Sequence, residues 1–545
     1  VKTFRAWCYL ELAKIYGKVP FVTTPVLDPQ AAEQLAASTK DHKDLVEITT
    51  WLIDDLKGYA YRTENNRLRP DWGNSSKYSQ YFIPVRVMLG ELYLWRGSYT
   101  QSKSDYIEAV RMYHNYLTFT NEEHVMTNRD NHAMDNSFTS YSLGYDNWFI
   151  KSSVDESFVA VMPLDTAEYV GTVSEIRSIF CSAYKNDYYP AAVASQRLDS
   201  ISMKQIYSRV DKEGDAPKIY YPVYTKSTNK RLIGDLRLYS IINEENVNNK
   251  YNSALSRTRT YISKYTDGNS RLSTDERLSQ IPYYRMSTIY LHMAEALNRA
   301  GYPQTAFLVL NWGITEETLA SQVYKKELFG LEKIKTLGFN TPVSTPYYSQ
   351  VLDTVADFGS SSFLAWPIGN GGNLFVTQDK LSGAERDRGE YQCGIHSLGC
   401  GDTEYNPYYT LPADDSRWTN VTNPTEPIWN KKEDPDTVIY KAAMELYKDS
   451  LSNYNTTMAK NLEYLYEDSH AIRTEYVAQR ILDEEALELC YEGTRFYDLL
   501  RYTRQNGDQS NTVALPDYIK WTYGPCSEID NKYNGTSWYL PLPKR

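Results

Sequence analysis

Residues 84–109, PVRVMLGELYLWRGSYTQSKSDYIEA, form the stretch that best predicts the fold of this chain. Small residues and aromatic rings recur along it in the pattern of two packed antiparallel helices: Leu89, Gly90, Tyr93, Gly97, Tyr99, Tyr106 and Ala109. Small residues let the two helices approach closely, and the rings fill the groove between them. Ser102 stands where this pattern usually has Ala, so the side chain there stays small. The stretch therefore predicts a helix-turn-helix pair.

A second stretch, residues 289–310, repeats the arrangement with Ala294, Gly301 and Ala306 as its small positions. Both stretches match the tetratricopeptide type of helix pair, but they lie too far apart in the chain to form a tandem array. We therefore expect a mainly α fold. In it, discontinuous tetratricopeptide-type helix pairs pack against a loop-rich ligand-binding half with few short strands.

The spacing of apolar residues predicts three further helices. Residues 1–16 read as an amphipathic helix with apolar positions at Phe4, Trp7, Cys8, Leu12 and Ile15. Residues 44–61 carry an apolar stripe of Leu45, Ile48, Leu52, Ile53 and Leu56. Residues 476–502 form a helical stretch broken by Gly493, with an apolar face of Ile481, Ala486, Leu489 and Cys490. Trp7 and Trp95 lie on helical faces and are assigned to the core.

Two irregular regions interrupt these helices. Residues 121–275 are rich in Asn, Ser, Asp and Tyr with short β-like runs such as SFVAVM, and residues 340–440 are rich in Gly, Pro and Asn. Long ordered loops on a helical base are where binding function usually resides. We divide the chain into an N-terminal helical scaffold (1–120), a loop-rich insertion and candidate ligand surface (121–275), a helix pair (276–335), a second loop-rich insertion (336–440), and C-terminal helices with a Pro-rich tail (441–545).

The chain begins inside the first expected helix, without an initiator Met, a signal peptide or a lipoprotein Cys. Chains rarely begin in the middle of a helix. We therefore expect that residues upstream of Val1, together with any targeting signal, are missing from this chain.

Charge and composition narrow the function. A net charge of −11 and a pI near 5.4 argue against a nucleic-acid-binding protein, because phosphate contacts need a basic face. No apolar run approaches the length of a membrane-spanning helix. The chain has 49 Tyr and 11 Trp but only 15 Phe, so most of its rings carry a polar group. Such rings stack on ligands and also donate hydrogen bonds, although Tyr in helix contacts is an alternative use.

Six cysteines are too few to act as a disulfide scaffold in a chain of this length. Cys8 and Cys490 lie in apolar helical patterns and are expected to be buried thiols. Cys393 and Cys400 bracket the loop QCGIHSLGC, where a disulfide and a reduced pair both remain open. His396 lies between them, but no fourth ligand for zinc is evident at metal-site spacing.

The sequence shows no catalytic constellation. It has neither a G-x-S-x-G nor an H-E-x-x-H motif, and IGNGG at 368–372 reads as a turn. Facing charges recur at helical separations in Glu492, Arg495, Asp498 and Arg501, which is typical of a structural ion-pair ladder rather than of paired catalytic carboxylates. Asp235 and Arg237 are expected to tie a loop to a helix. We expect no enzyme activity, no cofactor and no bound metal.

Candidate ligand contacts are aromatic rings on polar, irregular segments together with their polar neighbours. A sugar ring has an apolar C–H face and a polar rim, so stacking rings beside amide and carboxyl groups match it. For any one ring, packing under a loop is an open alternative. The candidates are Trp72, Tyr145, Asp146, Asn147, Trp148, Tyr184, Asn186, Asp187, Tyr188, Tyr189, Trp366 and Trp418.

Six blocks of the sequence resemble the SusD/RagB family and occur in that family's order. They are RAWCYLELAKIYGKVPFVTTPV, the helix pair around Leu92 to Tyr106, Asp235-Leu236-Arg237, YYRMSTIYLHMAEALNRAGYPQTA, ELCYEGTRFYDLLRY and WYLPLP. The resemblance implies a lipid-anchored nutrient-binding protein on the extracellular face of the Bacteroidota outer membrane. It implies binding of oligosaccharides, or of peptides in RagB-like members, and delivery to a SusC-like TonB-dependent β-barrel transporter. The implied fold has four tetratricopeptide units against a loop-rich half.

The chain departs from the family pattern in three ways. The N-terminal portion with the lipid-bearing Cys is absent, so the membrane anchor is implied by the resemblance alone. The usual ERxxEL signature has Glu-Arg where this chain has Glu484-Glu485, which removes one cation. The segment 313–440 is longer than typical. Two other classes stay open: a soluble tetratricopeptide scaffold that binds a peptide tail, and an α-helical glycoside-processing enzyme.

Overall fold

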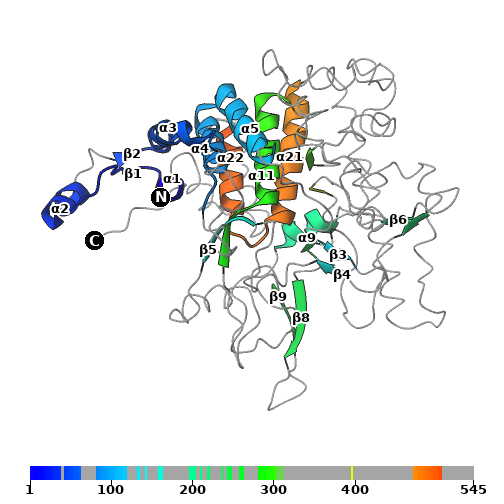
Figure 1. Ribbon diagram of the computed structural model, residues 1–545. Coiled ribbons are helices and arrows are strands. Elements are labelled where there is room, and N and C mark those ends of the chain that lie inside the picture. Colours follow the sequence, from blue (N-terminus) through cyan, green and yellow to red (C-terminus); the bar gives the residue numbers. More distant parts are fainter. Residues whose placement is uncertain are drawn as a thin grey trace, which may run out of the picture.

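The computed structural model describes residues 1–37, 42–62, 82–118, 132–134, 141–143, 158–163, 195–203, 209–211, 218–220, 235, 237–238, 242–247, 257–262, 280–302, 306, 309–310, 395–396 and 470–505. Helices predominate among these residues, and the strands are short (Figure 1). The prediction of a mainly α fold is therefore confirmed.

Helices α4 (Val85–Thr100) and α5 (Lys103–Thr118) form the predicted helix pair. Gln101 ends α4 in the left-handed region, with φ of 56°, and the chain turns directly into α5. A Cβ atom on Gly90 would lie 2.5 Å from the ring of Tyr113, and one on Gly97 would lie 3.0 Å from the ring of Tyr106. The two glycines thus let rings of α5 lie against the backbone of α4, as the spacing predicted.

Helix α3 (Leu45–Leu56) confirms the stripe predicted for residues 44–61, because all five apolar residues of that stripe are buried. Asp44 caps the helix in a reciprocal capping box with Glu47, which satisfies two backbone donors of the first turn. A single 3₁₀ turn, η1 (Lys57–Tyr59), follows α3. The short helix α2 (Pro29–Ala37) precedes it in the chain.

Helix α1 (Lys2–Tyr16) exists as predicted, but its buried face was assigned wrongly. Ala6, Leu10 and Ala13 are fully buried, whereas Cys8 is exposed and Leu12 is 40% exposed. Both sets recur at helical spacing, so periodicity alone did not separate them. Helix α1 packs against α3 and α4, and the face with Ala6, Leu10 and Ala13 is the one that becomes buried.

Trp7, a large residue of α1, lies outside the fully buried face of that helix. Trp7 is only partly buried and meets Tyr283 edge to face, with ring centroids 4.5 Å apart. Trp7 therefore packs against the core without being fully buried in it, whereas Trp95 is fully buried as expected.

Helix α11 (Met286–Ala300) belongs to the second predicted unit and ends at Gly301, whose φ of 96° suits glycine. Strand β10 (Gln280–Arg285) leads into it and pairs antiparallel with β5 (Phe158–Pro163). Strand β5 contains the β-like run noticed in the sequence. The sheet thus joins part of the first loop-rich region to the start of α11.

Helices α21 (His470–Glu488) and α22 (Arg495–Gln505) account for the predicted C-terminal stretch. The turn between them has positive φ at Tyr491 (66°) and at Gly493 (83°), which is the break that the sequence indicated. Cys490 is buried in this turn, as expected.

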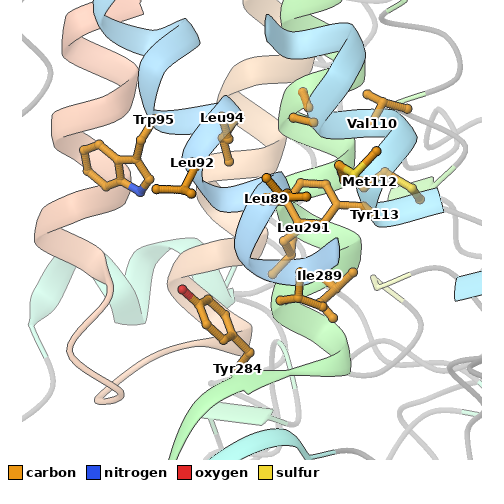
Figure 2. Close-up of a cluster of buried hydrophobic side chains, with 14 of the residues drawn as sticks. Leu89, Leu92, Leu94, Trp95, Val110, Met112, Tyr113, Tyr284, Ile289 and Leu291 are labelled. Atoms are coloured by element: carbon orange, nitrogen blue, oxygen red, sulfur yellow. The ribbon is translucent and has the colours of Figure 1, made fainter. Parts of the chain in front are cut away.

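Helices α4, α5, α11, α21 and α22 lie side by side, although they come from three widely separated parts of the chain (Figure 1). Their apolar faces share one hydrophobic core. In its centre, Leu89, Tyr113 and Leu291 meet between α4, α5 and α11 (Figure 2). The scaffold is therefore discontinuous in sequence but continuous in space.

The remaining described elements are short. They comprise helix α9 (Gln196–Met203) and the antiparallel strand pairs β1 (Val19–Pro20) with β2 (His42–Lys43), β3 (His132–Met134) with β4 (Tyr141–Leu143), β6 (Arg209–Asp211) with β7 (Lys218–Tyr220), and β8 (Ile242–Val247) with β9 (Arg257–Ile262). Within the described part of the chain, no helix combines the length and the apolar character needed to span a bilayer.

Candidate functional site

The residues predicted to contact a ligand lie outside the described residues, and so do Cys393 and Cys400. These ligand contacts stay predictions: Trp72, Tyr145, Asp146, Asn147, Trp148, Tyr184, Asn186, Asp187, Tyr188, Tyr189, Trp366 and Trp418. What the structure does describe is how parts of both loop-rich regions are attached to the helical scaffold.

The first attachment is Arg237, which comes from the first loop-rich region and is fully buried. Its Nη2 donates to Asp235 Oδ2 at 2.7 Å and to Glu484 Oε2 of α21 at 2.8 Å. Its Nη1 lies 3.3 Å from Glu488 Oε2, one turn further along α21. Burial lowers the pKa of Arg237, but the attraction of Asp235 and Glu484 outweighs it and raises the pKa above its ordinary value. Arg237 therefore ties its loop to a helix as a permanent cation.

The second attachment comes from the other loop-rich region, at Ile395 and His396. The Ile395 carbonyl accepts from Arg237 Nη1 at 3.4 Å, and the His396 backbone N–H donates to the Leu310 carbonyl at 2.9 Å. His396 Nδ1 lies 3.0 Å from Glu484 Oε1. Both loop-rich regions thus meet at the same carboxylate of α21.

Arg285, at the junction of β10 and α11, extends this network toward the C-terminal turn. It donates to Glu488 Oε1 at 3.1 Å, and through two nitrogens to Glu492 at 2.8 Å and 2.9 Å. Glu492, which belongs to the predicted ladder, therefore has a partner 207 residues away in the chain. We call this network the loop anchor; it consists of Asp235, Arg237, Arg285, His396, Glu484, Glu488 and Glu492.

The electrostatics of the loop anchor favour fixed charges over proton transfer. Burial alone raises the pKa of Glu484, but Arg237 and His396 outweigh burial and lower that pKa to about 2. A carboxylate with so low a pKa stays ionised near neutral pH and cannot act as a general acid there. Sequence reasoning identified Asp235 and Arg237, but it missed Arg285 and His396. No local spacing links either of them to α21.

The other three ladder residues lie around α22. Arg501 Nη2 donates to Asp498 Oδ1 at 2.9 Å and also lies 2.9 Å from Glu295 Oε2 of α11. Arg495 Nη1 donates to the Leu482 carbonyl at 2.7 Å. Asp498 and Arg501 are each only 2% exposed, so these charges are buried between helices instead of forming a solvated face.

Comparison with known proteins bears on the same C-terminal helices. The profile of the SusD family matches residues 442–545, which include α21 and α22 and therefore Arg501 as well as Glu484, Glu488 and Glu492 of the loop anchor. This match confirms the resemblance to the SusD family. No curated protein matches the chain.

Solved structures of SusD-type proteins are also similar to this chain. NanU of Bacteroides fragilis shares 13% identity over 92% of this chain and 69% of its own length, with a TM-score of 0.39. A SusD-like carbohydrate-binding protein of the same species shares 12% identity over 92% of this chain and 66% of its own, with a TM-score of 0.40. A SusD superfamily protein of Bacteroides vulgatus shares 13% identity over 92% of this chain and 70% of its own, with a TM-score of 0.37.

Proposed function

We propose that this chain is a non-catalytic binding protein that captures oligosaccharides at the cell surface and delivers them to a TonB-dependent transporter. The observation that carries the proposal is the SusD-family match over residues 442–545. The matched helices supply the carboxylates to which both loop-rich regions are attached. The part of the chain that matches the family therefore also contains Glu484, the carboxylate that Arg237 and His396 contact.

The loop anchor supports a binding role on physical grounds. Ordering a long loop at the moment of binding costs conformational entropy and lowers affinity. Arg237 and His396 each fix one point of a loop-rich region on α21 before any ligand arrives. Loops positioned in this way by a rigid scaffold are a common arrangement for binding sites.

The aromatic composition supports a glycan rather than another ligand. The 49 Tyr and 11 Trp supply flat apolar faces with polar groups at their edges, which is what a sugar ring needs. Peptides also use such rings, so peptide binding of the RagB type is the alternative within the same family. The loop residues predicted above, Trp72, Trp148 and Tyr188 among them, are the proposed contacts.

The test is calorimetric titration of the full chain with a panel of soluble glycans and mixed peptides, followed by analysis of the products. Saturable binding of glycans that remain uncleaved supports the proposal. Loss of binding in Trp72→Ala, Trp148→Ala or Tyr188→Ala then identifies contacts, with Trp51→Ala as a control on the helical scaffold.

Three other outcomes count against the proposal. Binding of peptides alone assigns the chain to the peptide-binding branch, and cleavage of the glycan assigns it to the glycoside-processing enzymes. Binding of neither, with capture of a folded protein partner, favours a tetratricopeptide scaffold.

The cellular half of the proposal has its own test. We propose, as the family resemblance implies, that the protein lies on the extracellular face of the outer membrane, held by an N-terminal lipid and seated on a SusC-like β-barrel. Affinity purification from outer membranes of a cell that expresses the full-length protein should recover a large β-barrel protein. Recovery without any such protein overturns this half and leaves ligand capture to be judged by calorimetry.

A further inference from the structure

A second buried group of charges lies inside the helical scaffold, apart from the loop anchor. We call it the core cluster; it consists of Glu91 of α4, His292 and Glu295 of α11, Glu485 of α21, and Asp498 and Arg501 of α22. Each of the six residues is at most 7% exposed. Four of them are carboxyl groups, and one guanidinium, that of Arg501, bonds to three of the four.

Three side chains of the core cluster converge on one point. A ring nitrogen of His292 and one carboxylate oxygen each from Glu485 and Asp498 all lie within 4.8 Å of one another. Two polar atoms there, His292 Nε2 and Asp498 Oδ2, are buried and have no hydrogen-bond partner in the described part of the chain. Buried polar atoms are rarely left without a partner, so each of these two calls for an explanation.

The surroundings of these two atoms orient them as a metal site would. His292 Nδ1 lies 2.5 Å from Glu91 Oε1, which leaves Nε2 as the nitrogen that faces a ligand. Tyr113, labelled in Figure 2, donates its hydroxyl to the same Glu91 oxygen at 2.7 Å. Metal-binding histidines almost always donate their other ring nitrogen to a carboxylate or carbonyl in this manner.

In Asp498, as in His292, one polar atom of the side chain is bonded and the other is left for a ligand. Arg501 donates to Oδ1 at 2.9 Å, and Oδ2 is the oxygen without a partner among the described residues. A carboxylate that binds a metal through one oxygen is itself usually hydrogen-bonded by its surroundings. Arg501 therefore serves as the outer partner of a metal ligand instead of competing for the second oxygen.

We propose that His292, Glu485 and Asp498 form a binding site for a divalent transition metal, with zinc as the best match. One imidazole nitrogen and two carboxylate oxygens suit zinc, whereas magnesium and calcium favour all-oxygen sites. Zinc bonds of about 2.0–2.2 Å bring two ligand atoms to within about 4 Å of each other, so the three side chains close in slightly on the ion. Sequence reasoning expected no metal because these ligands come from three separate helices.

The charge balance explains why this chain would use a metal. Glu485 stands where the family resemblance leads us to expect the Arg of an ERxxEL signature, and it brings a carboxyl group near Asp498. Glu295, Glu485 and Asp498 all lie within 3.4 Å of Nη2 of the same Arg501, so three buried carboxyl groups share one guanidinium. A divalent ion between Glu485 and Asp498 would add the positive charge that this single guanidinium does not supply.

The test compares zinc binding and thermal stability of the full chain with those of two variants, after stripping with a chelator. Glu485→Arg introduces the cation of the family signature at this position. Asp498→Asn replaces the second carboxylate ligand with a neutral amide. The unmodified chain should bind one more equivalent of zinc than either variant and should lose thermal stability when stripped. Glu485→Arg should fold, as circular dichroism shows, and its melting temperature should not respond to the chelator.

Two further variants sharpen the assignment. Glu91→Gln replaces the charged partner of His292 Nδ1 with a neutral amide and should weaken zinc binding about 10- to 100-fold without abolishing it. Glu492→Gln alters the loop anchor and should retain the full zinc stoichiometry. Comparison among variants is essential because Cys393, His396 and Cys400 are also zinc-type ligands. Equal stoichiometry in the unmodified chain and in folded Glu485→Arg, with no effect of the chelator on melting, overturns the proposal.

Discussion

Two neighbouring residues of α21, Glu484 and Glu485, belong to buried groups with opposite electrostatics. In the loop anchor, Glu484 faces Arg237 and His396, and its pKa falls to about 2. In the core cluster, Glu485 faces Asp498 and Glu295 and lies 3.4 Å from Arg501, and its pKa rises well above the ordinary value. Burial acts in the same direction on both. The difference shows that the balance of neighbouring positive and negative groups decides the direction in which the pKa of a buried carboxyl shifts.

The largest expected effect comes from removing the cation of the loop anchor. Arg237→Met leaves Asp235, Glu484 and Glu488 buried without their shared partner, and breaking a buried pair in this way costs about 3–5 kcal/mol. Denaturant unfolding should show this loss, and calorimetry should show weaker ligand binding because the first loop is released.

Lys57→Met is the matched control for Arg237→Met. Lys57 pairs with Asp54 at 2.6 Å, but both side chains are 63% exposed, so the change should stay within about 0.5 kcal/mol. Similar destabilisation by the two variants would show that the loop anchor adds no more than a surface ion pair.

Acid should weaken the loop anchor within a defined pH window. The folded pKa of Glu484 is depressed from 4.5 to about 2, so its contribution is fully present above pH 4.5 and is lost as the pH falls through the folded value. The shift corresponds to about 3 kcal/mol. In metal-free protein, Glu485 makes stability depend on pH in the opposite direction. Its folded pKa is raised, so its contribution is present below pH 4.5 and is lost as the pH rises through the folded value. Urea unfolding across this range, with and without Glu484→Gln, checks both slopes.

Isosteric substitutions make the comparison direct at neutral pH. Glu484→Gln removes a charged acceptor of Arg237 and should cost about 1.5–3 kcal/mol. In chelator, Glu485→Gln replaces a carboxyl whose pKa is raised by burial, Asp498 and Glu295 with an amide of similar shape, and should cost less than about 1 kcal/mol. Unfolding midpoints of both variants measured in the same buffer test this order. An equal loss in both would show that Glu485 is charged even without metal.

The smallest expected effect concerns the helix pair beside the core cluster. Gly90→Ala would place a Cβ atom 2.5 Å from the ring of Tyr113, the same side chain that donates to Glu91. The displaced ring should cost about 1–2 kcal/mol, since overpacking outweighs the better helix propensity of Ala. Gly58→Ala is the control, because no atom of the described residues lies within 4 Å of the point that its new methyl carbon would occupy, and its stability should change by less than about 0.5 kcal/mol. Ligand binding should survive in both, because the loop anchor is untouched.

Local patterns predicted much of the scaffold because local contacts produce it. The stripe of α3, the Gly90 and Gly97 positions of α4, and the break at Gly493 all follow from spacing within one or two helices. The orientation of α1 did not follow from spacing. Its alanine face and its aromatic face are both periodic, and the choice depends on the helix that packs against it.

Sequence spacing also failed to predict the partners of several charged residues. Sequence spacing grouped Glu492 with Arg495 and Arg501, and the structure places Glu492 against Arg285. It also grouped Glu484 and Glu485 as one step of a signature, although the two side chains lie in different networks. Consecutive residues on a helix point about 100° apart, so each meets a different neighbour.

By itself, the sequence determined the main helices of the scaffold, the break at Gly493, and the family that the chain resembles, since these depend on residues close together in the chain. Only the tertiary structure decided which charges are buried together, because those partners lie on segments up to 251 residues apart. The loop anchor and the core cluster both exist because the folded helices bring such distant side chains into a dry interior. There, an unpaired charge is too costly to remain, and each carboxyl must find a cation or keep its proton.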